Sequence, residues 1–192
     1  MNSPQIHALD DLDVPARELR AMAEIADYAE FILEGELELI AAAPAVLSRQ
    51  VAGLISERLK TPARLDVASY RLTDESVPDG GSSYVAGGGS KHPGSHVALL
   101  NLNGGARSGP YKGPKLAIWR HKASGMTAGP AASDGDRVTM AAWDMAGAVD
   151  LIPERVVLVP ADCFVSLWPM RPEGFNVTGG RLIWSSYLTL TQ

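Results

Sequence analysis

The stretch Leu65-Asp66-Val67-Ala68-Ser69-Tyr70-Arg71-Leu72 marks a change in the residue pattern of this 192-residue chain. Its side chains alternate with a two-residue period, which predicts a β-strand. The apolar residues before Pro62 recur at helical spacing instead. We therefore predict a chain in two parts, a helical arm over residues 1–62 and a β domain over residues 63–192.

Six further segments after the first strand have strand character, and Gly- and Pro-containing turns separate them. Between them the sequence lacks the long helical patterns that parallel strands need as crossovers, so we predict a mostly antiparallel sheet. The expected fold class is α+β: two N-terminal helices followed by a β sandwich or small barrel. Residues 141–151 are ambiguous, because Gly147 weakens a helix there. The predicted strands cover residues 95–101, 115–120, 137–143, 155–159, 163–168 and 181–191.

Two helices are expected in the arm. The first should run from about Val14 to Ile40, with Asp13 as its N-cap, and Gly35 leaves a break near its end open. The second should run from Pro44 to Lys60, because the Thr61-Pro62 pair stops it. Both carry apolar stripes that must pack against a sheet or a neighbouring subunit.

The net charge of -5 and the hydrophobic fraction of 46% fit a folded domain and disfavour disorder throughout. The charge is uneven along the chain. Residues 1–40 contain ten acids and two bases, a formal charge of -8. Residues 80–133 contain six bases, no acids and 12 of the 19 glycines, a formal charge of +6. The sequence thus predicts an acidic arm and a basic, glycine-rich loop region over residues 73–114.

The cysteine content, the N-terminus and the apolar stretches together predict the compartment. The single cysteine excludes an intramolecular disulfide. The N-terminus lacks a signal-peptide pattern, and the longest apolar stretch, residues 39–47, is shorter than the ~20 residues of a membrane span. We expect a soluble protein made in the cytoplasm, with no membrane partner.

The glycine-rich motifs do not predict a nucleotide or metal cofactor. Residues 104–109 and 89–94 have the glycine spacing of a phosphate-binding loop, but neither is followed by the required Lys-Ser/Thr pair. His92 and His96 are four residues apart, yet Pro93 and Gly94 between them disfavour a helix and no third ligand is near. We therefore expect no cofactor.

Catalytic constellations are also missing from the sequence pattern. Cys163 could serve as a nucleophile with His121 as its base, but its apolar surroundings favour a buried structural cysteine. There is no Gly-x-Ser-x-Gly elbow of the hydrolase type. Our main hypothesis is therefore a non-catalytic assembly protein.

In this hypothesis copies of the chain self-associate, with the acidic arm of one copy against the basic loop of the next. The spacing of the acids places them on one polar face of the predicted helix. The alternative interpretation is that this face is simply exposed to solvent. The candidate interface residues are Glu24, Asp27, Glu30, Glu34, Glu38, Lys91, Arg107, Lys112, Lys115 and Arg120.

The chain resembles virion structural proteins of tailed bacteriophages. The resemblance rests on the Ala-rich helical start over Arg17–Ala43, the long loop over Gly80–Gly113, and the closing strand Arg181-Leu182-Ile183-Trp184-Ser185-Ser186-Tyr187-Leu188-Thr189-Leu190. It implies a capsid, neck or tail subunit in the virion, a homo-oligomer that contacts other virion proteins, with no catalysis. It carries over no functional residues.

Two alternatives stay open. The first is an enzymatic or ligand-binding β-barrel with the long loop as a lid, in which His121, Asp144 and Cys163 would be tested first. The second is single-stranded nucleic-acid binding, with Tyr84, Tyr111 and Trp119 as stacking residues among the bases of the loop.

Overall fold

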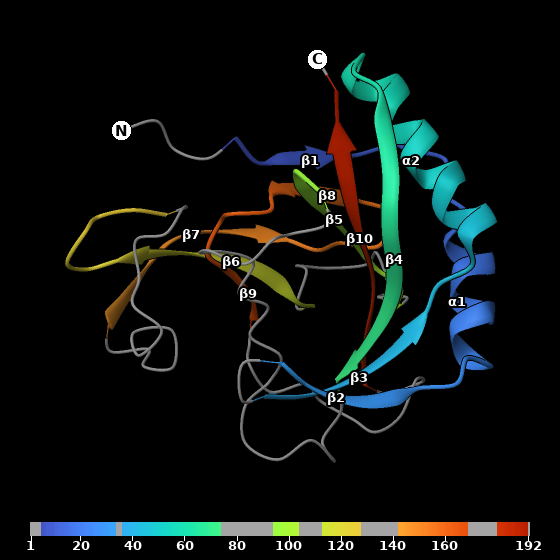
Figure 1. Ribbon diagram of the computed structural model, residues 1–192, viewed down its shortest axis with the longest axis horizontal. Helices are drawn as coiled ribbons and strands as arrows, with labels where there is room; N and C mark the ends of the chain where they lie inside the picture. Colours follow the sequence, from blue (N-terminus) through green and yellow to red (C-terminus); the bar gives the residue numbers. More distant parts are fainter. Residues whose placement is uncertain are drawn as a thin grey trace.

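The computed structural model describes residues 5–33, 36–73, 94–103, 113–127, 142–168 and 180–191. Within residues 32–38 the backbone alone is described where it forms strands. These parts build two antiparallel sheets with two helices on the outer side of the larger sheet (Figure 1). Neither helix is long and apolar enough to cross a membrane.

The larger sheet has seven strands in the order β1-β8-β5-β10-β4-β3-β2, and every neighbouring pair is antiparallel. The long strands β4 and β10 run side by side over most of their length, with one register shift between Tyr187 and Leu188. The bounds are β1 His7–Leu9, β2 Ala29–Leu33, β3 Glu36–Ala42, β4 Ala63–Thr73, β5 His96–Asn101, β8 Val156–Pro160 and β10 Arg181–Leu190.

The smaller sheet has three strands in the order β7-β6-β9, with bounds β7 Trp143–Asp150, β6 Lys115–His121 and β9 Val165–Trp168. It packs against the inner face of the larger sheet. The apolar layer between the sheets draws on β5, β8 and β10 from one side and β6 and β9 from the other, with Val97, Val157, Ile183, Leu116 and Val165 as examples. No described residue of β3 or β4 belongs to this layer.

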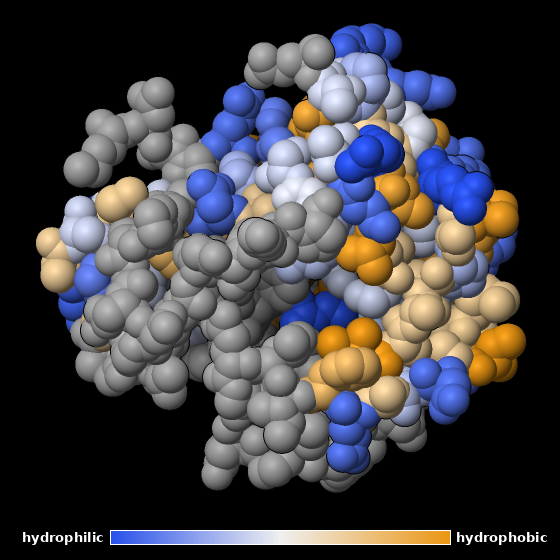
Figure 2. Space-filling view, viewed as in Figure 1, coloured by the Kyte–Doolittle hydropathy of each residue, from blue (hydrophilic) through white to orange (hydrophobic). Residues whose placement is uncertain are grey.

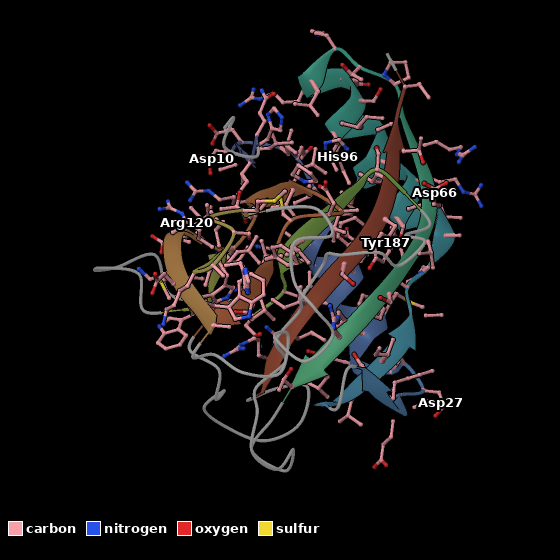
Figure 3. The ribbon with its side chains drawn as sticks, turned by 60° about the vertical axis from the view of Figure 1, so that its left-hand side comes forward. Asp10, Asp27, Asp66, His96, Arg120 and Tyr187 are labelled. Carbon is pink, nitrogen blue, oxygen red and sulfur yellow. The ribbon has the colours of Figure 1, made fainter. Side chains whose placement is uncertain are left out.

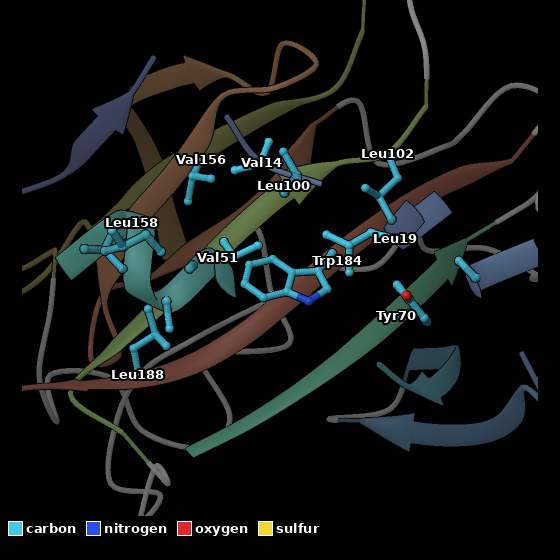
Figure 4. Packing of buried hydrophobic residues seen from close by; sticks show 14 of the residues in the cluster. Val14, Leu19, Val51, Tyr70, Leu100, Leu102, Val156, Leu158, Trp184 and Leu188 are labelled. Carbon is cyan, nitrogen blue, oxygen red and sulfur yellow. The ribbon is translucent and has the colours of Figure 1, made fainter. Parts of the chain in front are cut away.

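The helices α1 (Ala16–Glu24) and α2 (Ala45–Leu59) cover the outer face of the larger sheet. Their buried residues meet alternate residues of β4, β5, β8 and β10, because successive side chains of a strand point to opposite faces. Figure 4 shows Trp184 at the centre of this core, near Val51, Leu19 and Tyr70. The Trp184 indole N–H donates to Ser48 Oγ of α2 at 3.1 Å, which satisfies its one polar atom.

The first helix differs from the prediction. Instead of one helix over residues 14–40, the chain forms the nine-residue α1, a short connection, and the antiparallel pair β2–β3. Its N-cap is Pro15 rather than Asp13. The physical reason lies in the pattern Glu36-Leu37-Glu38-Leu39, which alternates in the two-residue period of a strand and not in that of a helix. Strands from both sides of the predicted boundary at residue 62 therefore pair in one sheet, β3 with β4 and β1 with β8.

Other predictions agree with the structure more closely. The second helix is confirmed over Ala45–Leu59, and Lys60 ends it in the left-handed conformation with φ 55°. The antiparallel arrangement and the α+β class with a sandwich of two sheets are confirmed in outline. The ambiguous residues 141–151 include strand β7, while most of the strand predicted over 137–143 lies outside the described residues.

Candidate functional site

Strands β4 and β10 present a row of polar side chains on the inner face of the larger sheet. Their register pairs Arg181 with Thr73, Ile183 with Arg71, and Ser185 with Ser69. Directly opposed residues of an antiparallel pair lie on the same face, and Ile183 belongs to the apolar layer between the sheets. The two arginines, the threonine and the serines therefore lie on the inner face of the larger sheet.

Both arginines of this row are buried. Arg71 and Arg181 are each 6% exposed, and they are diagonal neighbours across the strand pair. The Nη1 atom of each is buried and makes no hydrogen bond, although other interactions engage both residues. Each guanidinium carries a permanent positive charge and several planar N–H donors, so two of them on one face favour the binding of an anionic group there.

The row changes character along the strands. Beyond the arginines, Ser69 Oγ and Ser185 Oγ share a hydrogen bond of 3.0 Å. The next pair is Val67 with Tyr187, and Val67 is 47% exposed, so the inner face is open at that point. Figure 3 shows Tyr187 midway along β10. Same-face neighbours along a strand are about 7 Å apart, so cationic, hydroxyl and apolar side chains follow each other within the reach of one small molecule.

The segment after β5 supports the beginning of β10. Asn103 Nδ2 donates to the Gly180 carbonyl at 2.9 Å, and the Leu182 N–H donates to Asn103 Oδ1 at 2.6 Å. The Asn103 N–H in turn donates to Asn101 Oδ1 at 3.0 Å. Asparagine side chains therefore hold the backbone on either side of Arg181.

The predicted acidic interface residues do not share one helix face. Glu24 is the last residue of α1 and pairs with Arg20 at 3.0 Å, Asp27 lies in the connection after α1, and Glu30 lies in β2. Glu34 lies outside the described residues, and only the backbone of Glu38 is described. The expected face is absent because the chain turns into the β2–β3 pair where a continuous helix was predicted.

The predicted basic residues fall mostly outside the described chain, namely Lys91, Arg107 and Lys112. Lys115 begins β6 and forms an ion pair of 3.1 Å with Asp150 of the neighbouring strand. Arg120 is exposed near the end of β6, and Figure 3 shows it far from Asp27. Whether these residues contact another copy stays a prediction.

The trio named for the enzymatic alternative is not brought together. Cys163 is buried in the layer between the sheets, and burial raises the pKa of its thiol to about 12. His121 lies instead beside Trp143, with ring centroids 5.1 Å apart, and its Nδ1 is 3.1 Å from Ser124 Oγ. Asp144 is exposed and lies 3.7 Å from Lys122. The prediction of a buried structural cysteine is confirmed.

The structure gives no support to the stacking residues named for nucleic-acid binding. Tyr84 and Tyr111 lie outside the described residues. Trp119 is 8% exposed and its indole N–H donates to Ser166 Oγ at 2.7 Å, so it offers no open ring face to a base. Of the two histidines considered as metal ligands, His92 is outside the described residues, and burial lowers the pKa of His96.

Sequence reasoning missed the arginine pair because each arginine sits inside a strand pattern. Arg71 and Arg181 lie in two predicted strands that are far apart in the chain, and the pattern of neither strand marks its arginine as a site residue. A basic residue at an inward position of a predicted sandwich strand was the available signal, since charged residues are rarely buried without a partner. That the two would be neighbours depended on the pairing of β4 with β10, which the local pattern does not specify.

Comparison with known proteins gives a fold and no family. No family model matches the chain, and no curated protein matches it. Solved structures do. The first is the non-heme α-ketoglutarate-dependent epimerase SnoN of nogalamycin biosynthesis, at 15% identity and a TM-score of 0.58, over 95% of this chain and 77% of that one. AviO1 from Streptomyces viridochromogenes matches at 15% identity and a TM-score of 0.55, over 96% of this chain and 89% of that one.

A prolyl-4-hydroxylase of Pseudomonas putida matches at 14% identity and a TM-score of 0.51, over 97% of this chain and 92% of that one. SnoN has also been solved with Fe3+, α-ketoglutarate and nogalamycin RO.

These similar structures include enzymes, and none of those named is a virion subunit. The expectations of a phage structural protein, of a virion location and of a chain without catalysis are therefore wrong. The resemblance rests on a helical start that the structure breaks at residue 24, on a loop over residues 80–113 and on one ten-residue strand. Of that loop, residues 80–93 and 104–112 lie outside the described residues, and strand β5 lies between them. At this level of identity the comparisons show the fold alone, a β sandwich shared with the epimerase SnoN, AviO1 and the prolyl-4-hydroxylase.

Proposed function

We propose that this chain is an enzyme that binds an acidic cosubstrate of the α-ketoglutarate type on the inner face of β4 and β10. The observation that carries the proposal is the buried pair Arg71 and Arg181 on one face of the sandwich. The shared fold with an α-ketoglutarate-dependent epimerase supports it.

The chemistry of the pair suits a carboxylate. A guanidinium presents planar N–H donors that match the two oxygens of a carboxylate, and such charge-assisted bonds are roughly twice as strong as neutral ones. Because both arginines are buried, the attraction is screened less than at the surface. The two guanidiniums would hold and orient the acid, which leaves the Ser69–Ser185 and Val67–Tyr187 pairs for the molecule that is acted on.

The Fe3+ of the SnoN complex requires several ligand side chains that lie close together. Non-heme iron sites of this type use two histidines and one carboxylate. In residues 5–33, 36–73, 94–103, 113–127, 142–168 and 180–191, no three His, Cys, Asp or Glu side chains lie close enough together to hold a metal. The described residues thus fit the acid and do not fit the iron.

A titration of the purified chain with α-ketoglutarate by calorimetry tests the proposal. We expect binding by the wild type, and a dissociation constant weakened about 10- to 100-fold by Arg181→Gln, since a bond to a charged group contributes about 1.5–3 kcal/mol. Arg64→Gln is the matched control, because Arg64 pairs with Asp66 at 2.8 Å on the rim of the sheet. Wild-type affinity in Arg181→Gln, or no binding by the wild type, would refute the site.

A second candidate is a barrel that binds the acid without turning it over, because the buried arginine pair accounts for binding an acid and supplies no group for turnover. The two candidates differ in one measurement. A purified enzyme should consume α-ketoglutarate when the small molecules of a cell extract are supplied, followed as loss of the acid from solution, whereas a binding barrel should return the acid unchanged.

A further inference from the structure

Arg181 lies at the end of a strand, where the sheet pairing of the described residues is incomplete. It is the first residue of β10, and on the β4 side it pairs with Thr73. On the β5 side the strand register begins only at Ile183, opposite Asn101. Among the described residues, the β5 ladder therefore stops short of Arg181, and strand ends open more readily than strand centres.

Asn103 supplies the missing bonds. Its Nδ2 donates to the Gly180 carbonyl at 2.9 Å and its Oδ1 accepts from the Leu182 N–H at 2.6 Å, so one side chain bonds the backbone on both sides of Arg181. The adjacent Leu102 N–H donates to the Leu182 carbonyl at 3.0 Å.

Asn103 is itself held from two directions. Its N–H donates to Asn101 Oδ1, and buried Asn101 donates from Nδ2 to the Leu151 carbonyl at 3.0 Å, next to the layer between the sheets. From the helix side, Arg20 Nη1 of α1 donates to the Leu102 carbonyl at 3.1 Å. The support of Arg181 is thus connected to both layers of the molecule.

We infer that Asn103 is a positioning residue for Arg181 and that it makes the site selective for doubly charged acids; this inference rests on the function proposed above. A bidentate guanidinium–carboxylate contact is lost when the guanidinium moves by about 1 Å. With Arg181 held in place, Arg71 and Arg181 present two positive charges to the ligand. With Arg181 displaced, only one of the two positive charges contacts the ligand. A dicarboxylate then loses more binding affinity than a monocarboxylate does.

The test compares α-ketoglutarate with its monocarboxylate analogue 2-oxobutyrate, by calorimetry, on the full chain. We expect Asn103→Ala to weaken α-ketoglutarate binding on the order of tenfold, the effect of about one net hydrogen bond, and to reduce the preference over 2-oxobutyrate. In the Arg181→Gln background, Asn103→Ala should cause no further loss, because the residue it positions is already gone.

Two variants separate positioning from loss of folding. Asn103→Asp keeps the acceptor for the Leu182 N–H and loses the donor to Gly180, so it should fall between wild type and Asn103→Ala. Ser48→Ala removes a buried side-chain bond to Trp184 on the opposite face and should leave both affinities unchanged. Wild-type affinity and selectivity in Asn103→Ala, or additive losses in the double variant, would overturn the inference alone. A wild type that binds neither acid would overturn the proposed function and this inference together.

Discussion

Leu182 and Trp184 of β10 lie on the helix-facing side of the larger sheet, whereas their neighbours Arg181 and Ser185 lie on the inner side. The same holds on β4, where Tyr70 faces the helices and Arg71 faces inward. One pair of strands therefore carries two surfaces of different chemistry. The helix-facing side is a packed apolar core whose Trp184–Ser48 bond is satisfied, and the inner side keeps buried charge. Packing on one face gives the rigid frame that charge on the other face needs.

This comparison predicts that substitutions on the two faces differ in what they change. The largest effect should come from Trp184→Ala, because Trp184 is fully buried among α2, β4 and β5 residues. We expect it to reduce the free energy of unfolding by about 3–5 kcal/mol, through the cavity and the unpaired Ser48 hydroxyl. Chemical denaturation monitored by circular dichroism measures this loss. A decrease under about 1 kcal/mol would show that the helix-facing side is not the stabilising core.

Arg71→Met makes the opposite test on the inner face. It should weaken α-ketoglutarate binding about tenfold, because one charge-assisted contact is lost, and cost less unfolding free energy than Trp184→Ala. Calorimetry and denaturation on the same preparation give both numbers. The distinction between the faces fails if Arg71→Met destabilises as much as Trp184→Ala does.

Ser185→Ala should have a smaller effect, because it removes a single hydrogen bond of 3.0 Å between two uncharged hydroxyls. We expect about 1 kcal/mol or less in unfolding free energy, with α-ketoglutarate affinity unchanged within about twofold. The matched variant Ser69→Ala removes the other partner and should behave alike. A large loss of affinity in either would extend the acid site along the strands.

The smallest effect concerns the rim, where Asp10 pairs with Arg155 through Oδ1 at 2.7 Å and Oδ2 at 3.0 Å. The hydrogen bond from Arg155 lowers the pKa of the Asp10 carboxyl below its ordinary value. A lowered folded-state pKa contributes stability above the ordinary aspartate pKa, and this stability is lost as the pH falls through the folded-state value.

Asp10→Asn should therefore lower stability at neutral pH and flatten its decline from about pH 5 downward. Because the Asp10 side chain is 45% exposed, we expect no more than about 0.5 kcal/mol. Denaturation curves at several pH values measure it, and about 0.5 M salt should reduce the difference. An equal slope in both proteins would show that the ion pair is not maintained in solution.

Local patterns predicted much of the fold for identifiable reasons. The second helix was predictable because its apolar stripe and the Thr61-Pro62 stop act within a few residues. The strands around Leu99, Val157 and Trp184 were predictable from composition and turns. The first helix failed after residue 24, since a helical spacing of apolar residues was extended over a segment whose charges and leucines alternate.

The candidate site was far less accessible to such reasoning. Its residues come from segments more than 70 positions apart, and only strand pairing brings them together. The glycine-rich and charged segments drew attention because they are unusual in composition, yet composition reports solvation and not proximity.

The sequence by itself determined the second helix, most strand positions, the antiparallel class and the buried state of Cys163, because these depend on the period and chemistry of short segments. The tertiary structure alone decided that β2 and β3 continue the sheet, that Arg71 and Arg181 share one face, and that Asn103 bonds the backbone around Arg181. Those facts depend on which strands pair and in which register. Pairing is set by the burial of whole faces, and no single segment encodes it.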